Sequence, residues 1–195
     1  RLKKRIVHII ISGLVIVFML SWMVPLIGLL IKIQSPGPIF FKQPRSGRNN
    51  ETFNCLKFRS MVVNSESNKA QASKDDKRIT PIGRFLRKTN LDEFPQFINV
   101  FKGQMTIVGP RPHMLSHTEH YSKLIQHYML RHFVKPGITG WAQVNGYRGE
   151  TRESDLMAKR VEYDLEYISN WTVMLDFKII FMTAWNMIRG EKNAY

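Results

Sequence analysis

The chain has 195 residues, enough for one compact domain with a membrane element but not for two full domains. Lysine and arginine number 29 against 15 aspartate and glutamate residues, a formal charge of +14 at pH 7. This excess predicts a polyanionic partner, which could be nucleic acid, an anionic lipid surface or a phosphorylated substrate. Cys55 is the only cysteine, which excludes an intrachain disulfide and a cysteine-based zinc cluster.

An apolar segment occupies residues 6–31, where His8 is the only ionisable side chain. As a helix it reaches about 39 Å at ~1.5 Å per residue, longer than the roughly 30 Å hydrocarbon core of a bilayer. Pro25 lies inside the segment and removes a backbone donor, so we expect a bend. Both flanks are basic, which favours a helix that enters and returns on one membrane face. We predict a re-entrant helix over residues 1–34, with a spanning helix as the alternative.

The remaining residues, 35–195, are predicted to form a cytoplasmic, membrane-associated α+β domain. Strand patterns joined by a polar connection predict a small β-hairpin at 39–42 and 52–61. Residues 64–78 are polar and lack aromatic side chains, so we expect a surface loop there. A loop, a short strand and an Asn-Gly turn are expected over 135–146. Helical periodicity predicts helices near residues 81–88, 90–102, 117–132, 154–168 and 172–189.

The last predicted helix, residues 172–189, mixes apolar and charged side chains and is too interrupted to span a bilayer. It fits an amphipathic helix at the membrane interface, with Trp171 and Trp185 near the headgroups, as well as it fits an ordinary core helix. Asp164 and Asp176 lie on the last two predicted helices. They are interpreted as helix-surface charges or as groups that close an active site, and the surface role is preferred for Asp176.

Asp92 and Glu93 are adjacent carboxylates at the start of a predicted helix that Asn90 can cap. Acidic residues in a first turn stabilise the helix dipole, and Asn-x-x-Glu resembles a capping box, so the pattern alone favours a structural role. The alternative is chemical. Two carboxylates at a positive helix end can bind a divalent cation, or one of them can attack a phosphate.

Basic residues accompany this acidic pair. Arg84, Arg87 and Lys88 precede it, Lys57 lies in the second predicted strand, and Arg111 lies in a Gly-Pro-Arg-Pro turn. An arginine offers a planar fork to phosphate oxygens, and rigid prolines would fix its direction. The alternative interpretation is a solvated basic surface.

Other nucleotide and metal motifs are missing. Neither a P-loop nor a Gly-x-Gly-x-x-Gly pattern occurs, which argues against those nucleotide-binding folds. Four histidines fall on or near one predicted helix: His117, His120, His127 and His132. They lack the acidic partner and the spacing of a metalloprotease motif, so we predict surface or interface positions for them.

Taken in order, several motifs resemble the bacterial sugar transferases, also called monotopic phosphoglycosyl transferases. After the basic and apolar N-terminus they are SPGPIFFKQPRSGRN (35–49), FNCLKFRSM (53–61), RKTNLDEFPQ (87–96), NVFKGQMTIVGPRP (99–112) and RHFVKPGITGWAQVNG (131–146). The similarity covers nearly the whole chain. RGET (148–151) and VEYDLEYISNW (161–171) look most like members that act on undecaprenyl phosphate with UDP-glucose.

The resemblance implies an enzyme that moves a hexose 1-phosphate from a UDP-sugar, with UDP-glucose favoured, onto undecaprenyl phosphate and releases UMP. This would be the first membrane step of exopolysaccharide or capsule assembly. It further implies a re-entrant helix in the bacterial inner membrane, an active site on the cytoplasmic face, contact with anionic lipid and dependence on Mg²⁺. It implies no nucleic-acid partner and leaves a homo-oligomer and the identity of the sugar open.

The resemblance also implies residue roles. Asp92 would be the nucleophile that carries the sugar phosphate covalently, and Glu93 would bind Mg²⁺ or assist proton transfer, with both carboxylates as metal ligands. The implied phosphate- and substrate-binding residues are Lys57, Arg87, Arg111, Arg131 and Gln143. Covalent transfer in two half-reactions implies ping-pong kinetics.

The chain departs from the family pattern in one place. Family members often bend the membrane helix at a Ser-Pro pair, whereas here Ser21 precedes Trp22 and the proline is Pro25, so we expect the break to be displaced by about a turn. Larger members carry an additional N-terminal region, which is consistent with an internal start at Arg1. A different class of protein, a non-catalytic membrane-anchored basic module that binds anionic lipid or nucleic acid, explains the charge and the apolar segment equally well.

Overall fold

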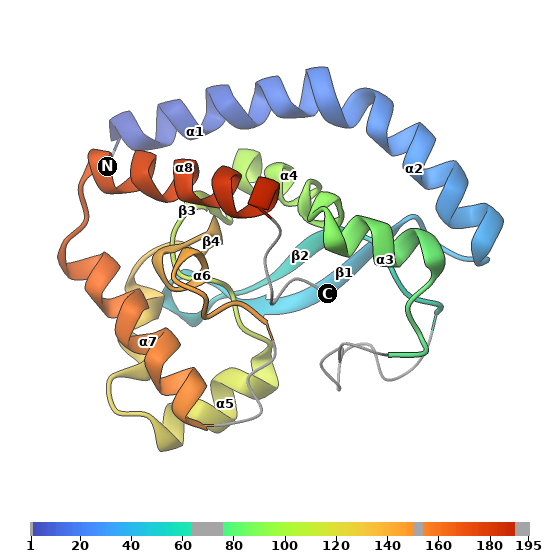
Figure 1. The fold of residues 1–195 in the computed structure, drawn as a ribbon. Helices are drawn as coiled ribbons and strands as arrows, with labels where there is room; N and C mark the ends of the chain where they lie inside the picture. Colours follow the sequence, from blue (N-terminus) through green and yellow to red (C-terminus); the bar gives the residue numbers. More distant parts are fainter. Residues whose placement is uncertain (1, 64–75, 150–153, 190–195) are drawn as a thin grey trace. The chain divides into compact units, whose positions relative to one another are not determined.

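The computed structural model describes residues 2–63, 76–149 and 154–189 (Figure 1). Its helices and two small two-stranded sheets confirm the predicted α+β class. Most of the polar segment 64–78, and the last two residues of the RGET motif, lie outside the described residues. The chain forms two compact units, one of residues 1–43 with 54–103 and the other of 44–53 with 104–194, and each is described by itself.

The N-terminal helix of the first unit runs without interruption through α1 (Leu2–Val15), a π-helical stretch (Ile16–Leu20) and α2 (Ser21–Gln34), and it is visibly curved in Figure 1. The expected irregularity is present, but it lies at 16–20, upstream of Pro25. A proline ring crowds the turn before it and leaves a carbonyl four residues earlier without its donor, and a widened π turn relieves such crowding. Among the described residues, one helix, Lys4–Gln34, is long and apolar enough to cross a membrane.

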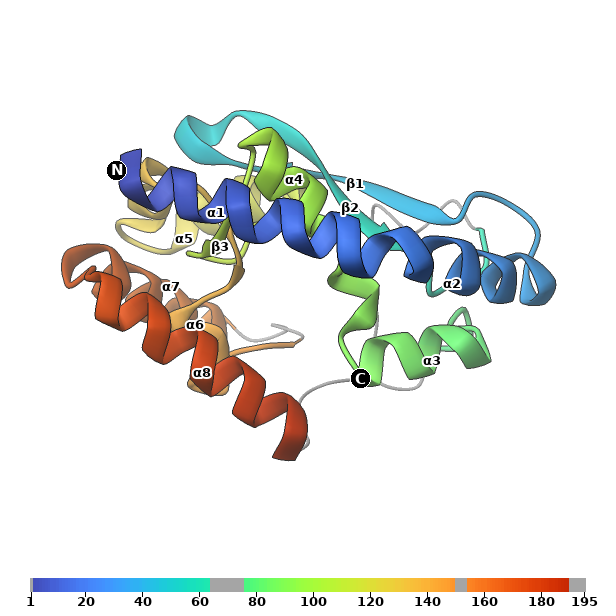
Figure 2. The ribbon, with the colours of Figure 1, turned by 90° about the horizontal axis from the view of Figure 1, so that it is seen from above.

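Both ends of this helix are tied to the first unit. Near its start the Arg5 guanidinium donates to the carbonyl oxygens of Val100 and Phe101. At its end the Gln34 side-chain oxygen accepts from the Ile82 N–H at 2.8 Å. α1 also packs against α4 (Gln96–Lys102), as Figures 1 and 2 both show. The helix is therefore a structural part of this unit along its whole length.

The core of the first unit lies under α2. One face of the long helix is buried against the hairpin and α3 (Pro81–Lys88) in a cluster of Leu20, Met23, Ile27, Ile31, Phe58 and Leu86. Its opposite face exposes large apolar side chains, among them Val17, Phe18, Trp22, Leu26, Leu29 and Ile33. Exposed apolar surface on this scale marks contact with a membrane or another protein.

The hairpin consists of β1 (Phe40–Ser46) and β2 (Thr52–Phe58). The first strand is longer than predicted and the second ends three residues earlier, at Phe58. Between them a short 3₁₀ turn, Arg48–Asn50, contains left-handed backbone at Asn49 and Asn50. Asparagine tolerates this conformation better than most residues, which explains why the Asn-Asn pair sits at the tip.

α3 begins where the sequence predicts, because the Thr80 hydroxyl accepts from the Gly83 N–H at 3.0 Å and Pro81 occupies the first turn. The prediction of one helix over 90–102 is wrong. A 3₁₀ turn, Leu91–Glu93, comes first, and α4 begins only at Gln96. Asn90 has a left-handed backbone (φ 58°) and, among the described residues, its side chain makes no capping bond.

In the second unit β3 (Thr106–Val108) pairs in parallel with β4 (Gly137–Thr139). The predicted helix 117–132 is correct only in its first part, since α5 (Leu115–Leu124) ends before a 3₁₀ helix, Tyr128–Phe133. Left-handed backbone at His127 separates the two. The expected strand within 135–146 is β4, and the short helix α6 (Trp141–Val144) follows it.

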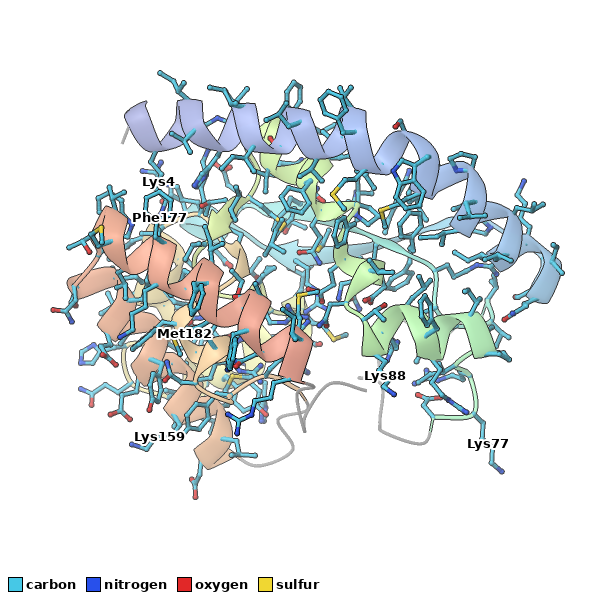
Figure 3. All side chains as sticks on the ribbon, turned by 45° about the horizontal axis from the view of Figure 1, so that its top comes forward. Lys4, Lys77, Lys88, Lys159, Phe177 and Met182 are labelled. Carbon is cyan, nitrogen blue, oxygen red and sulfur yellow. The ribbon has the colours of Figure 1, made fainter. Side chains whose placement is uncertain are left out.

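The last two helices, α7 (Ser154–Ser169) and α8 (Val173–Arg189), match their predicted ranges closely. α7 packs Met157 and Val161 against Tyr121 and Tyr128. α8 is not a core helix, because Asp176 and Ile179 are buried on it whereas most of its large apolar side chains are exposed: Val173, Met174, Phe177, Ile180, Phe181, Trp185, Met187 and Ile188. Phe177 is labelled on α8 in Figure 3.

Gly83 is the point at which α3 packs against the backbone of Ser60, two residues after the end of β2. A Cβ atom there would lie 1.9 Å from the Ser60 carbonyl oxygen, which is backbone and cannot swing away. We therefore expect Gly83→Ala to destabilise the protein by about 3 kcal/mol, at the upper end of overpacking costs. Thermal unfolding in detergent measures this. Gly13→Ala is the matched control, since its Cβ would meet Phe101 at an ordinary 3.8 Å, and equal melting temperatures for the two variants would contradict the expectation.

Candidate active site

Asp92 and Glu93 are buried side by side on the 3₁₀ turn that precedes α4. Each residue is only 7% exposed. Carboxylates that merely complement a helix dipole lie in solvent, and taking them out of water is costly unless cations and donors compensate them. Burial of the pair therefore argues against a role limited to the helix dipole, which the pattern alone favoured.

Lys57 on β2 supplies one compensating cation. Its Nζ lies 2.8 Å from Glu93 Oε1. The alignment depends on Asn99 of α4, whose side-chain oxygen accepts from the Leu56 N–H at 3.0 Å while its Nδ2 donates to the Asn54 carbonyl at 2.8 Å. Asn99 thus binds two backbone groups on one edge of β2 and fixes the strand that carries Lys57 relative to the acidic turn. No local pattern in the sequence marks this buried asparagine as a support of the site.

Arg87, in the last turn of α3, is the second cation. Its Nε donates to Ser60 Oγ at 2.9 Å. Burial lowers the pKa of the Arg87 guanidinium, and the negative charges of Asp92 and Glu93 oppose that shift, so the three groups lie within electrostatic reach of one another. An arginine stays protonated despite such a shift. Four of the predicted site residues, Lys57, Arg87, Asp92 and Glu93, are therefore gathered in the first unit.

The other three predicted site residues belong to the second unit. Arg111 is half-buried in the turn that follows β3. Arg131 is only 2% exposed, and its Nε and Nη2 donate to Asp164 Oδ2 at 3.0 and 2.6 Å. Its Nη2 also donates to the Arg111 carbonyl at 2.7 Å. These internal bonds occupy the Arg131 Nε and Nη2 atoms and join Arg131 to the backbone of Arg111, while its predicted role in substrate or phosphate binding stays a prediction.

Gln143 lies buried on α6. Its Nε2 donates to the Ile138 carbonyl at 3.3 Å, and among the described residues its Oε1 has no hydrogen-bond partner. The contact with Ile138 fixes which side of the amide is oxygen. Because the atom without a partner is an acceptor, Gln143 suits a substrate hydroxyl or N–H group better than a phosphate oxygen. Its predicted role in substrate or phosphate binding stays a prediction.

Two aspartates of the second unit differ from the surface charges expected on helices. Asp164 is 1% exposed in its pair with Arg131. The preferred interpretation of Asp176 is wrong, because its carboxylate is buried within hydrogen-bond distance of the Tyr167 hydroxyl (2.7 Å) and the Trp171 indole N–H (3.2 Å). The partners of Asp164 and Asp176 lie in other segments or across a turn, and helical periodicity does not predict such contacts.

The surface assignment is also wrong for one histidine. His132 is buried, and burial together with the charge of Arg131 lowers its pKa to about 4, so it is neutral at pH 7. His120 and His127 are exposed, as expected. Arg160, which the sequence analysis did not identify, donates to the Tyr147 and Gly149 carbonyls at 2.9 Å each, and burial lowers its pKa to about 10.

The family model for bacterial sugar transferases matches residues 1–190. The chain is 51% identical over 185 residues to a UDP-glucose:undecaprenyl-phosphate glucose-1-phosphate transferase of Escherichia coli K12, covering 94% of this chain and 40% of that protein. It is 55% identical over 167 residues to a protein of the same name from Xanthomonas campestris pv. campestris, covering 85% and 34%.

A third relative, from Caulobacter vibrioides, bears the same name and is 39% identical over 195 residues, covering 100% of this chain and 72% of that protein. The chain therefore spans less than half the length of the first two relatives and most of the third.

Proposed function

The chain belongs to the bacterial sugar transferase family, and on this premise we propose that it transfers glucose 1-phosphate from UDP-glucose to undecaprenyl phosphate and releases UMP. This reaction would begin exopolysaccharide or capsule assembly at the membrane. The observation that carries the proposal is the buried pair Asp92 and Glu93, supported by Lys57 and Arg87, in a chain so similar to transferases of that name.

In the first half-reaction an Asp92 carboxylate oxygen attacks the sugar-bearing phosphorus of the donor. The new bond joins Asp92 to that phosphorus, the bond to the UMP oxygen breaks, and UMP leaves with the electron pair. Lys57 and Arg87 offset the charge that otherwise keeps an anionic carboxylate away from a diphosphate. Burial of Asp92 favours this attack, since a poorly hydrated carboxylate is the more reactive nucleophile.

In the second half-reaction a phosphate oxygen of the lipid attacks the same phosphorus. The bond to Asp92 breaks, its carboxylate is regenerated, and the product is a lipid diphosphate sugar. We assign Arg111 to the binding of donor phosphate oxygens, which its forked guanidinium suits. Gln143 is assigned to a hydroxyl or N–H group of the donor, because its unpaired atom is an acceptor.

The proposed cofactor is Mg²⁺, with Asp92 and Glu93 as its protein ligands. Among the described residues no group of three or more His, Cys, Asp or Glu side chains could hold a metal ion. Two carboxylates fit Mg²⁺ nonetheless, because this ion is usually bound by one or two carboxylates together with substrate phosphates and waters. When bound it would neutralise phosphate charge, while Lys57 orients Glu93 through their ion pair.

We further propose that residues 1–34 form a re-entrant helix and that 35–195 form a catalytic domain on the cytoplasmic face of the inner membrane. The attachment of both helix ends to one unit supports this topology, since Arg5 contacts Phe101 and Gln34 contacts Ile82. A spanning helix would pull that unit, with its buried charges, across the hydrocarbon core. The exposed apolar face of α8 supports an interfacial position for that helix.

The basic binding module is the weaker alternative. In a surface that only binds anionic lipid or RNA, two buried carboxylates would weaken binding, because they repel the polyanion and cost desolvation energy. The burial of Asp92 and Glu93 therefore favours an enzyme.

The topology can be tested with single cysteines at Arg1 and Arg48 in a Cys55→Ala background. Both are expected to react with a membrane-impermeant maleimide from the cytoplasmic face of inverted vesicles and to be protected in right-side-out vesicles. Reaction after detergent addition controls for accessibility. If the two positions label from opposite faces, the helix spans the bilayer.

The nucleophile can be tested by UMP release from UDP-glucose in detergent with Mg²⁺ and undecaprenyl phosphate. Asp92→Asn is expected to lower the rate at least ~1,000-fold, since an amide cannot form the covalent bond. Glu166→Gln, an exposed acid on α7, is the matched control and should be unaffected. UDP-galactose and UDP-N-acetyl sugars in parallel identify the donor. Full activity of Asp92→Asn would refute the assignment, and no turnover of any donor would favour the binding module.

A further inference from the structure

The turn that carries Arg111 is held along its backbone. Four consecutive carbonyl oxygens each accept a hydrogen bond from within the second unit: Pro110 from Gly137 N (2.9 Å), Arg111 from Arg131 Nη2 (2.7 Å), Pro112 from Arg45 Nη1 (3.1 Å) and His113 from Ser46 N (3.1 Å). The two central donors are arginine side chains, and they come from different segments, β1 and the 3₁₀ helix 128–133.

Side-chain donors are needed here for a physical reason. Pro110 and Pro112 have no N–H, so this segment cannot join a regular ladder on that side. Buried carbonyls without donors are costly, and Pro112 is buried. Arg131 and Arg45 supply side-chain donors to the two consecutive carbonyls of Arg111 and Pro112.

The Arg131–Asp164 pair provides one of these donors, although burying two charges costs desolvation energy. Both residues are almost fully buried, at 2% and 1% exposure, and a buried ion pair commonly gives no more stability than apolar side chains of the same size. The pair instead fixes the orientation of the Arg131 guanidinium. Two bonds to one Asp164 oxygen orient the guanidinium so that its Nη2 reaches the Arg111 carbonyl.

We propose that Arg45 and the Arg131–Asp164 pair are positioning residues, which fix the two carbonyls that directly follow the Arg111 Cα atom so that its guanidinium is presented to the phosphates of the nucleotide-sugar. This inference rests on the proposed function and specifies three residues that act through a fourth. A displacement of about 1 Å in a group that binds transition-state charge can lower the rate by ~100-fold. The effect therefore appears in kcat more than in the KM for the donor.

The first experiment separates positioning from folding. Arg131→Met with Asp164→Leu removes both charges together, which preserves the packing of a buried pair better than breaking it. We expect a melting temperature within a few degrees of the wild type and kcat for UMP release lowered by about 100-fold. Wild-type kcat in this double variant would overturn the proposal.

The second experiment asks whether Arg45 acts through Arg111. Arg45→Met is expected to lower kcat by ~10-fold, and Arg45→Lys to recover most of it, because the lysine keeps a charged donor. Arg48→Met is the matched control, since Arg48 lies on the same hairpin and is exposed. In an Arg111→Met background, Arg45→Met should cause no further loss, since coupled residues are not additive.

A further ~10-fold loss in that background would show that Arg45 acts elsewhere and would overturn the proposal. Full activity of Arg111→Met in an active enzyme would also overturn it, but would leave the proposed transfer reaction intact. Failure of the proposed function has a different signature, because the wild-type protein would then release no UMP from any donor.

Discussion

The first unit keeps two adjacent carboxylates away from water, and this constraint governs how its candidate site is built. Asp92 and Glu93 are buried together, and the burial of two carboxylates is costly unless cations and donors compensate them. Lys57 reaches Glu93 from β2, the charge of Arg87 on α3 acts on both carboxylates, and Asn99 of α4 binds the backbone of β2. The hairpin, α3 and α4 therefore each contribute a polar or charged side chain around the two carboxylates, and apolar packing alone does not account for this. Such an arrangement is what attack on a diphosphate requires.

The second unit also contains buried charged side chains, and there they hold the backbone of loops. Arg131 and Asp164 form a buried pair, and Arg160 is buried with its bonds directed at the Tyr147 and Gly149 carbonyls. In each case a buried guanidinium holds the backbone of a segment that is not a regular helix or strand. Loops that bind substrate need such support, because few ladder hydrogen bonds define their conformation.

Helices whose ends and length are set by capping residues and periodicity were predicted correctly. α3 starts at Thr80 and Pro81, and the ranges of α7 and α8 follow from periodicity over more than fifteen residues. The break at 91–95 was missed because it depends on the left-handed backbone of Asn90, which a capping pattern does not distinguish from a cap. The acidic pair itself was identified from its basic neighbours and the ordered motifs, whereas its burial was not foreseeable. Glu93 and Lys57 are 36 positions apart, and Asp164 and Arg131 are 33 apart, so tertiary structure decides both pairings.

The covalent role of Asp92 is the central claim, and isotope exchange tests it most directly. The purified protein is incubated with UDP-glucose, Mg²⁺ and labelled UMP, without undecaprenyl phosphate. If Asp92 takes the sugar phosphate and releases UMP reversibly, label enters UDP-glucose at a rate comparable to turnover, and Asp92→Asn abolishes the exchange. Absence of exchange in a preparation that transfers sugar phosphate once lipid is added would contradict the account, because the lipid phosphate would then attack the donor directly.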